Sequence, residues 1–387
     1  MKKIIVYFLC LATVLQADSK YPADISYMVA DLKYSQEHGV KICEVQHGVL
    51  STFLGDVFLH GDQGLLCPQI AEVFAEFPAK KWVVPTLVSF QPLLAAFEQS
   101  PSWEKVSMLD FLVDDPEFKK IAAKRPADPH NLAAYKGMLY ARPQAIKKFK
   151  SLCKKHPGVL VIDKATHPYW VDKYLMTLLF TTHPALVQIK PEWGIYAKNY
   201  TPDLAGQIIQ EIPADAFVIK PRGAFLGDGV IIVSKDELNE TLRYILSVTG
   251  DLSMNADKSF SYWAKDPFDS FIVEKYYPSD ALHVEAMQNK MYEPTMRVAF
   301  VMMYNNKKID CRFLGGYWLL PNKALDEPGS LNETKKAYCK PPFFAEVPDT
   351  VLAAVRRQCE DALPLLYKEM LEKRFVSSKK LNKRKDT

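Results

Sequence analysis

Short apolar runs recur along the chain and alternate with segments in which apolar residues return every three or four positions. This alternation is typical of an α/β protein, because the runs can form strands and the periodic segments can form helices that cover them. Turn residues such as Asn305-Asn306 indicate hairpins, so several strands should be antiparallel. The expected strands are 26–34, 40–46, 82–90, 158–163, 217–221, 229–234, 270–277 and 296–316, and the expected helices are 62–76, 139–155, 171–181, 235–248 and 348–374.

Composition and charge narrow the class of partner. The 387 residues are 48% hydrophobic and 24% charged, which is typical of a folded protein with one large or two medium domains. The formal net charge is only +4, and the basic residues are spread along the chain, so nucleic acid is not expected as the main partner. A small molecule or a peptide is the expected ligand.

The first residues have the pattern of a secretory leader. Lys2 and Lys3 precede an apolar run over 4–15, and Ala17 precedes a polar stretch. This pattern predicts a signal peptide at 1–17 and export to the periplasm or medium. The run is too short for a stable membrane span. The alternative is a buried first strand in a cytoplasmic protein. At the other end, 376–387 is polar and basic and is expected to be disordered.

A glycine-containing loop lies between two expected strands in the segment FVIKPRGAFLGDGVIIV, at 217–233. The first strand ends at Lys220, and the loop contains Gly223, Gly227 and Gly229. Glycines let backbone N–H groups approach phosphate oxygens, and a lysine at the strand end supplies positive charge. The segment is neither a Walker A loop nor a dinucleotide fingerprint. It therefore indicates either a polyphosphate-binding loop or a hairpin without a ligand.

A further apolar strand, SFIVEKYYPSD at 270–280, runs into Glu274 and then a turn. This order of strand, glycine loop, strand and glutamate before a short hinge resembles the ATP-grasp family. The resemblance implies two α+β lobes with the nucleotide between them and mostly antiparallel sheets with flanking helices. It also implies that Lys220 contacts phosphate or the adenine side, that Glu274 and Tyr276 contact the adenine edge, and that Asp280 contacts the ribose.

Lys173 lies on an expected amphipathic helix before the glycine loop. The ATP-grasp family places a second lysine near this position, and the segment resembles the glutathionylspermidine synthase-like branch, although here it reads Asp172-Lys173. The resemblance implies that Lys173 binds nucleotide. The alternative is a solvated helix lysine.

Three oxygen-bearing side chains lie on the first two expected strands. Asp31 is on one strand, and Glu44 and Gln46 are on the next. On an extended strand Glu44 and Gln46 project to the same face, and ligands that offer only oxygen suit Mg²⁺. The arrangement resembles the metal-binding strand pair of circularly permuted ATP-grasp proteins, in which this pair lies at the N-terminus. The alternative is a pair of hairpin carboxylates that face solvent.

The metal-site segment departs from the family pattern at two points. Gln46 stands where asparagine is usual, and 27–30 lack the arginine that precedes the first acid. Arg297, on a strand where it can contact a γ-phosphate, and Arg222 are the residues that we expect to replace the missing charge.

The resemblance implies an ATP- and Mg²⁺-dependent ligase. It would join a carboxylate to an amine or thiol through an acyl phosphate, forming a C–N bond in the amine case and converting ATP to ADP. A kinase on the same fold and an exported, catalytically degenerate binding protein are the alternatives. The implied domains are the signal peptide, N-terminal strands with the Mg²⁺ site at 18–60, an α/β substrate or pre-ATP-grasp domain at 61–160, nucleotide-binding lobes at 161–375, and the tail at 376–387.

Overall fold

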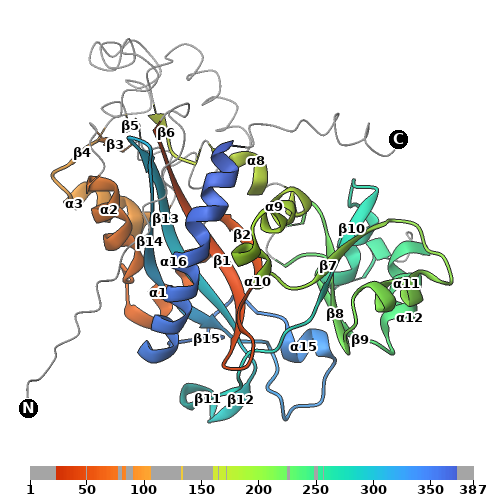
Figure 1. The fold of residues 1–387 in the computed structure, drawn as a ribbon. Coiled ribbons are helices and arrows are strands. Elements are labelled where there is room, and N and C mark those ends of the chain that lie inside the picture. Colours follow the sequence, from red (N-terminus) through yellow and green to blue (C-terminus); the bar gives the residue numbers. More distant parts are fainter. Residues whose placement is uncertain are drawn as a thin grey trace, which may run out of the picture.

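Two antiparallel sheets form the centre of the protein (Figure 1). The computed structural model describes residues 23–48, 50–76, 81–83, 90–105, 132–133, 160–163, 165–170, 172–224, 227–247, 252–255 and 257–372. One sheet has five strands in the order β15-β14-β13-β1-β2, and the other has four in the order β7-β10-β8-β9. Helices flank both, so the predicted α/β class with mostly antiparallel sheets is confirmed.

The five-stranded sheet joins segments from both ends of the chain. Strand β1 pairs with its sequence neighbour β2 on one side and with β13 on the other. A two-residue turn at Asn306 and Lys307, both with positive φ, connects β13 to β14, as is favoured in tight hairpins. The predicted hairpin is thus present. The strands are β1 (Asp24–Ser35), β2 (Gly39–His47), β13 (Thr295–Asn305), β14 (Lys308–Leu319) and β15 (Phe344–Ala345).

Alternate residues of β1 enter two separate hydrophobic cores, because successive side chains of a strand point to opposite faces. Tyr27 and Val29 pack with the helices α1 (Leu50–His60), α2 (Leu66–Glu76) and α3 (Gln91–Gln99). Met28 and Ala30 face the other side, which the long helix α16 (Asp349–Glu372) crosses in Figure 1. Asp31 follows Tyr27 and Val29 by two-residue steps and therefore lies on the face of α1 to α3.

One face of the four-stranded sheet is covered by helices from the same segment of the chain. Ile208, Leu242 and Trp263 pack against Phe271 and Val273 of β10. Glu274 follows Val273 by one residue and therefore faces away from these helices, toward the five-stranded sheet. The elements are β7 (Trp193–Ala197), α11 (Leu204–Glu211), β8 (Ala216–Pro221), β9 (Ile231–Ser234), α12 (Leu238–Ser247), α14 (Lys258–Ser261), η3 (Tyr262–Ala264) and β10 (Ser270–Lys275).

Shorter elements connect the two sheets. They are α8 (His167–Trp170), α9 (Lys173–Leu179), η2 (Phe180–Thr182), α10 (Pro184–Gln188), β11 (Leu282–Val284), η4 (Glu285–Met287), β12 (Lys290–Tyr292) and α15 (Leu331–Lys335). Three-residue and two-residue strands form two small parallel pairs: β3 (Lys81–Val83) with β4 (Trp103–Lys105), and β5 (Leu132–Ala133) with β6 (Leu160–Val161). Within the described ranges no helix is both long and apolar enough to cross a bilayer.

Several expected elements differ from the structure or lie outside it. The helix expected over 62–76 begins only at Leu66, and a separate helix, α1, precedes it. Gly61 and Gly64, both with positive φ, form the break between them. Of the strand expected over 82–90, Trp82 and Val83 lie in β3, residues 84–89 lie outside the described residues, and α3 starts at Gln91. The signal peptide, the helix over 139–155 and the basic tail lie outside the described residues.

Candidate functional site

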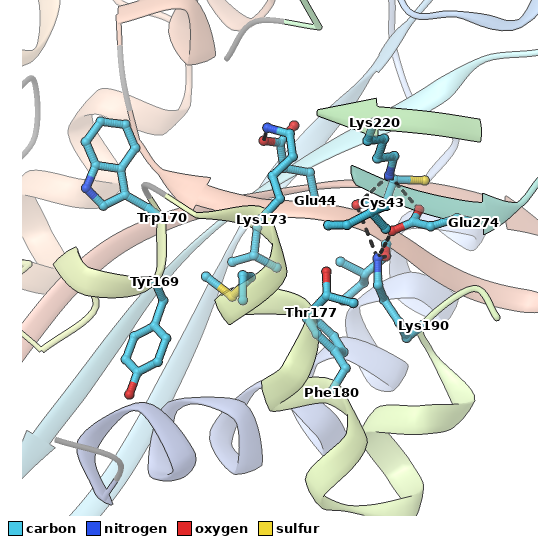
Figure 2. Close-up of a pocket in the computed structure, with 14 residues that line it drawn as sticks. Cys43, Glu44, Tyr169, Trp170, Lys173, Thr177, Phe180, Lys190, Lys220 and Glu274 are labelled. Carbon is cyan, nitrogen blue, oxygen red and sulfur yellow. Dashed lines mark hydrogen bonds and ion pairs between the residues drawn. The ribbon is translucent and has the colours of Figure 1, made fainter. Parts of the chain in front are cut away.

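A cavity lies between the two sheets and takes side chains from both of them. Six cationic and three anionic side chains line it. The cations are Lys33, Lys220, Lys275, Arg297, Lys335 and Lys336, and the anions are Asp31, Glu44 and Glu274. A smaller pocket, drawn in Figure 2, adjoins it and shares Cys43, Glu44, Lys220 and Glu274 with it. The excess of positive charge suits an anionic ligand.

Strand register places Asp31 at the centre of the acidic side of the cavity. Asp31 lies opposite Glu44 on β2 and opposite Arg297 on β13. Arg297 donates from Nε and Nη2 to the two carboxylate oxygens of Asp31, each over 2.7 Å. Burial alone would lower the pKa of Arg297, but the facing carboxylate outweighs it and raises the pKa above its ordinary value. Arg297 is therefore a permanent charge beside the acidic pair.

A β-bulge at Cys43 orients the next residues. Asp31 pairs with Glu44 but Leu32 pairs with Ile42, so Cys43 is the extra residue on β2. Glu44 and Gln46 then face the same cavity as Asp31, as the alternation along a strand predicts. The carbonyl oxygen of Cys43 accepts a hydrogen bond from Lys220 over 3.0 Å. Sequence alone did not indicate this bulge.

Glu274 is shared by two lysines at the other side of the cavity. Lys190 and Lys220 donate to its two oxygens, each over 2.5 Å, and all three side chains are buried. Figure 2 shows the two ammonium groups converging on this carboxylate. Burial would raise the pKa of Glu274, but the two positive charges outweigh it and hold the pKa below its ordinary value. The carboxylate is therefore ionised, although burial lowers the pKa of Lys190.

Lys173 connects three parts of the site. It begins helix α9, whose N-cap residue Asp172 accepts from the backbone N–H of Tyr174. The Lys173 Nζ donates to Glu44 over 2.6 Å and also to the carbonyl oxygen of Ala224 in the loop after β8. Burial would raise the pKa of Glu44, yet the ammonium of Lys173 keeps it lowered. Lys173 is thus placed against the proposed metal-binding carboxylate and is not a solvated helix lysine.

Two other residues from the prediction line the cavity. Gly227 has positive φ, and Tyr276 donates its hydroxyl hydrogen to Glu293. Gly229 also has positive φ, and a Cβ there would overlap Pro221. It shapes the loop without lining the cavity.

The remaining predicted residues lie elsewhere. Gly223 packs against Phe268. Arg222 is held by Asp172, at 2.6 and 3.2 Å, so Arg297 and not Arg222 faces the acidic pair. Asp280 is exposed and accepts from the backbone N–H of Gln36 in the β1–β2 turn.

Sequence reasoning missed Lys190, Lys33 and Lys336. A signal for Lys190 exists, because Ile189-Lys190-Pro191 repeats the tripeptide that ends β8 at 219–221. Lys33 lies two residues after Asp31 on the same face of β1, where its Nζ donates to the Pro294 carbonyl oxygen. Lys336 follows α15 and has no comparable pattern.

The residues of the cavity fit a magnesium ion bound to a polyphosphate. Among the described residues no three His, Cys, Asp or Glu side chains gather as a metal site. Asp31 and Glu44 supply two carboxylates on paired strands, and Gln46 adds an amide oxygen, which together form the donor chemistry that Mg²⁺ prefers. Mg²⁺ commonly takes few protein ligands and completes its shell with phosphate oxygens and water.

No protein-family model and no curated protein sequence matches this chain. Solved structures of ATP-grasp proteins are similar at low identity. A glutathione synthetase-like effector from Globodera pallida is 12% identical with a TM-score of 0.41, over 78% of this chain and 74% of that one. A putative gamma-glutamylcysteine synthetase from Methylobacillus flagellatus is 11% identical with a TM-score of 0.42, over 91% and 88%. D-alanyl-alanine synthetase A from Vibrio cholerae is 11% identical with a TM-score of 0.36, over 75% and 81%.

Proposed function

We propose that the protein binds Mg²⁺ and ATP in the cavity and acts as an ATP-grasp ligase that activates a carboxylate as an acyl phosphate. The observation that carries the proposal is the division of charge across the cavity and the smaller pocket that adjoins it. Arg297 and Lys173 contact the acidic pair Asp31 and Glu44 on one side, and Lys190 and Lys220 share Glu274 on the other. A polyphosphate between them would meet cations on both sides.

The two ends of the cavity differ in polarity, and this difference determines which end would bind the base and which the phosphates. Val218 on β8 lies opposite Ile232 on β9 and beside Glu274 on β10, and Tyr276 follows directly after that strand. This apolar end suits a base, because ligand sites combine apolar walls with a few polar groups that fix orientation. The phosphates would then extend toward Asp31 and Arg297.

The reaction requires two displacements. A carboxylate oxygen of the substrate attacks the γ-phosphorus while the bond from phosphorus to the ADP oxygen breaks, and an amine nitrogen then attacks the acyl carbon, losing a proton and expelling phosphate. Arg297 and Lys173 would neutralise charge on the transferring group, and Lys190 and Lys220 would hold the phosphates that remain on ADP. Asp31, Glu44 and Gln46 would hold Mg²⁺, which supplies neutralisation of phosphate charge when bound.

Calorimetric titration of the full chain with ATP, with and without Mg²⁺, tests the proposal. Lys220→Ala and Glu44→Ala should abolish the magnesium-dependent heat, whereas Arg243→Gln, in an exposed pair on α12, should bind as the parent does. ADP release that depends on both a carboxylate and an amine would then establish ligation. A parent that shows no magnesium-dependent binding would overturn the proposal. Binding without turnover would instead indicate a binding protein, and a phosphorylated acceptor a kinase.

A further inference from the structure

Lys336 differs from the other cations that line the cavity. Its Nζ donates to the carbonyl oxygen of Val230 over 2.9 Å and to the hydroxyl of Ser259 over 2.7 Å, and neither partner is charged. Every other lining cation has a carboxylate within 4.0 Å. Ion pairs join Glu293 to Lys33 and Lys335, Glu274 to Lys220, Glu192 to Lys275, and Asp31 to Arg297. Among the described residues, no carboxylate lies this close to Lys336.

The surroundings of Lys336 leave its charge poorly compensated. Its side chain is half-buried, and burial lowers the pKa of its ammonium group. The carboxylates of Asp257 and Asp228 attract this charge from beyond ion-pair distance, but burial outweighs them. A desolvated ammonium with no carboxylate in direct contact costs free energy that hydrogen bonds to neutral groups offset only in part. An anionic ligand in the cavity would supply a counter-charge in direct contact with the ammonium group.

The backbone that carries Lys336 is fixed against the four-stranded sheet. Helix α15 starts with a capping box between Ser330 and Glu333. Asn332 accepts from the backbone N–H of Ile232 over 3.2 Å and donates to Ser259 over 3.1 Å. These contacts hold α15 beside the outer strand β9, in the position seen in Figure 1.

Lys336 also lies against the glycine loop. A Cβ placed on Gly227 would be 3.4 Å from the Cε of Lys336, and both residues line the cavity. The positive φ of Gly227 is a conformation in which loop N–H groups can turn toward an anion. A phosphate at this point would meet the loop on one side and the ammonium on the other.

We propose that Lys336 binds the polyphosphate of the nucleotide together with the glycine loop at Gly227. This inference rests on the proposed function and adds to it a phosphate-binding residue from a segment that follows the β13–β14 hairpin. The competing role is purely structural, in which Lys336 only joins α15 to Val230 and Ser259. The two roles differ in which part of the nucleotide they affect.

Titrations with Mg²⁺-ATP and with adenosine separate the two roles. Lys336→Met should weaken ATP binding roughly 10-fold to 100-fold, the range expected for one lost contact to a charged group, and leave adenosine affinity unchanged. Lys336→Arg should restore most of the ATP affinity. Lys340→Met, an exposed lysine on the same segment, is the matched control and should bind both ligands as the parent does.

An equal loss of ATP and adenosine affinity in Lys336→Met would overturn the inference in favour of the structural role. Unchanged affinity for both would exclude any role in binding. Either result leaves the proposed function intact, provided that the parent binds Mg²⁺-ATP. Failure of the parent to bind Mg²⁺-ATP would overturn both proposals. Thermal unfolding of each variant verifies that the titrated protein is folded.

Discussion

At the scale of single residues, Glu274 is the group whose loss should cost the most stability. Glu274→Gln leaves Lys190 and Lys220 as buried cations without a shared carboxylate, and breaking such a pair typically costs about 3–5 kcal/mol. Urea titration of the free energy of unfolding at pH 7 measures the effect. Glu360→Gln, which breaks an exposed pair with Arg356 on α16, should change it little. Equal effects in the two variants would contradict the expected importance of the buried triad.

Glu274 also determines the direction in which the free energy of unfolding changes with pH. Its pKa is lowered in the folded protein from an ordinary value of 4.5, so its stabilisation is present above pH 4.5 and is lost as the pH falls through the folded pKa. Glu44 has a pKa lowered in the same direction. The unfolding free energy of the parent should therefore fall below pH 4.5, and that of Glu274→Gln should fall less steeply.

Sequence could locate Glu274, Lys220 and the Asp31–Glu44 pair because each lies at a recognisable position on a strand. Lys190 was missed because its role depends on contact with Glu274, 84 residues later in the chain. The bulge at Cys43 could not be foreseen either, because it appears only when β2 is aligned with β1. The local sequence pattern indicates which residues have suitable chemistry, but only the tertiary structure shows which of them contact one another.

At the scale of elements, two helical glycines should respond in opposite ways to alanine. In α1, a Cβ on Gly55 would lie 2.2 Å from the ring of Tyr317, so Gly55→Ala should destabilise by about 1–3 kcal/mol through overpacking. In α11, nothing lies within 4 Å of a Cβ on Gly206, so Gly206→Ala should stabilise by about 0.5–1 kcal/mol. Denaturant midpoints measure both. Stabilisation by both substitutions would show that α1 does not pack on β14 as described.

Elements with one strong periodicity were predicted best. Helix α16 fills almost the whole of 348–374, and β8 and β10 fall within the runs expected for them. Helix α1 was missed because apolar residues are spread over most of LSTFLGDVFLH with a glycine at its centre, which weakens the helical pattern. Residues 84–89 of the strand expected over 82–90 lie outside the described residues, and α3 begins just after that range with Gln91-Pro92, where proline is tolerated in the first helical turn.

At the scale of the whole molecule, a nucleotide in the cavity should couple the two sheets, because it would contact β1, β2 and β13 as well as β8 and β10. Saturating Mg²⁺-ATP at 100 times its dissociation constant would add about 2.7 kcal/mol to the free energy of unfolding. Hydrogen exchange should slow in β2 and in β8 together. Magnesium alone, as the control, should leave β8 unchanged. Slowing confined to one sheet would contradict a ligand bound between them.

The pairing of β1 with β13 also determines the order in which the protein can assemble. The four-stranded sheet uses residues 193–275 only, so all its strands can leave the ribosome and pair as one contiguous unit. Strand β1 is synthesised first, yet its partner β13 begins at Thr295. Until then the β1–β2 hairpin has an unpaired edge, and such edges favour aggregation. The exposed edge of the β1–β2 hairpin must therefore be kept from pairing with other chains until the ribosome has synthesised β13.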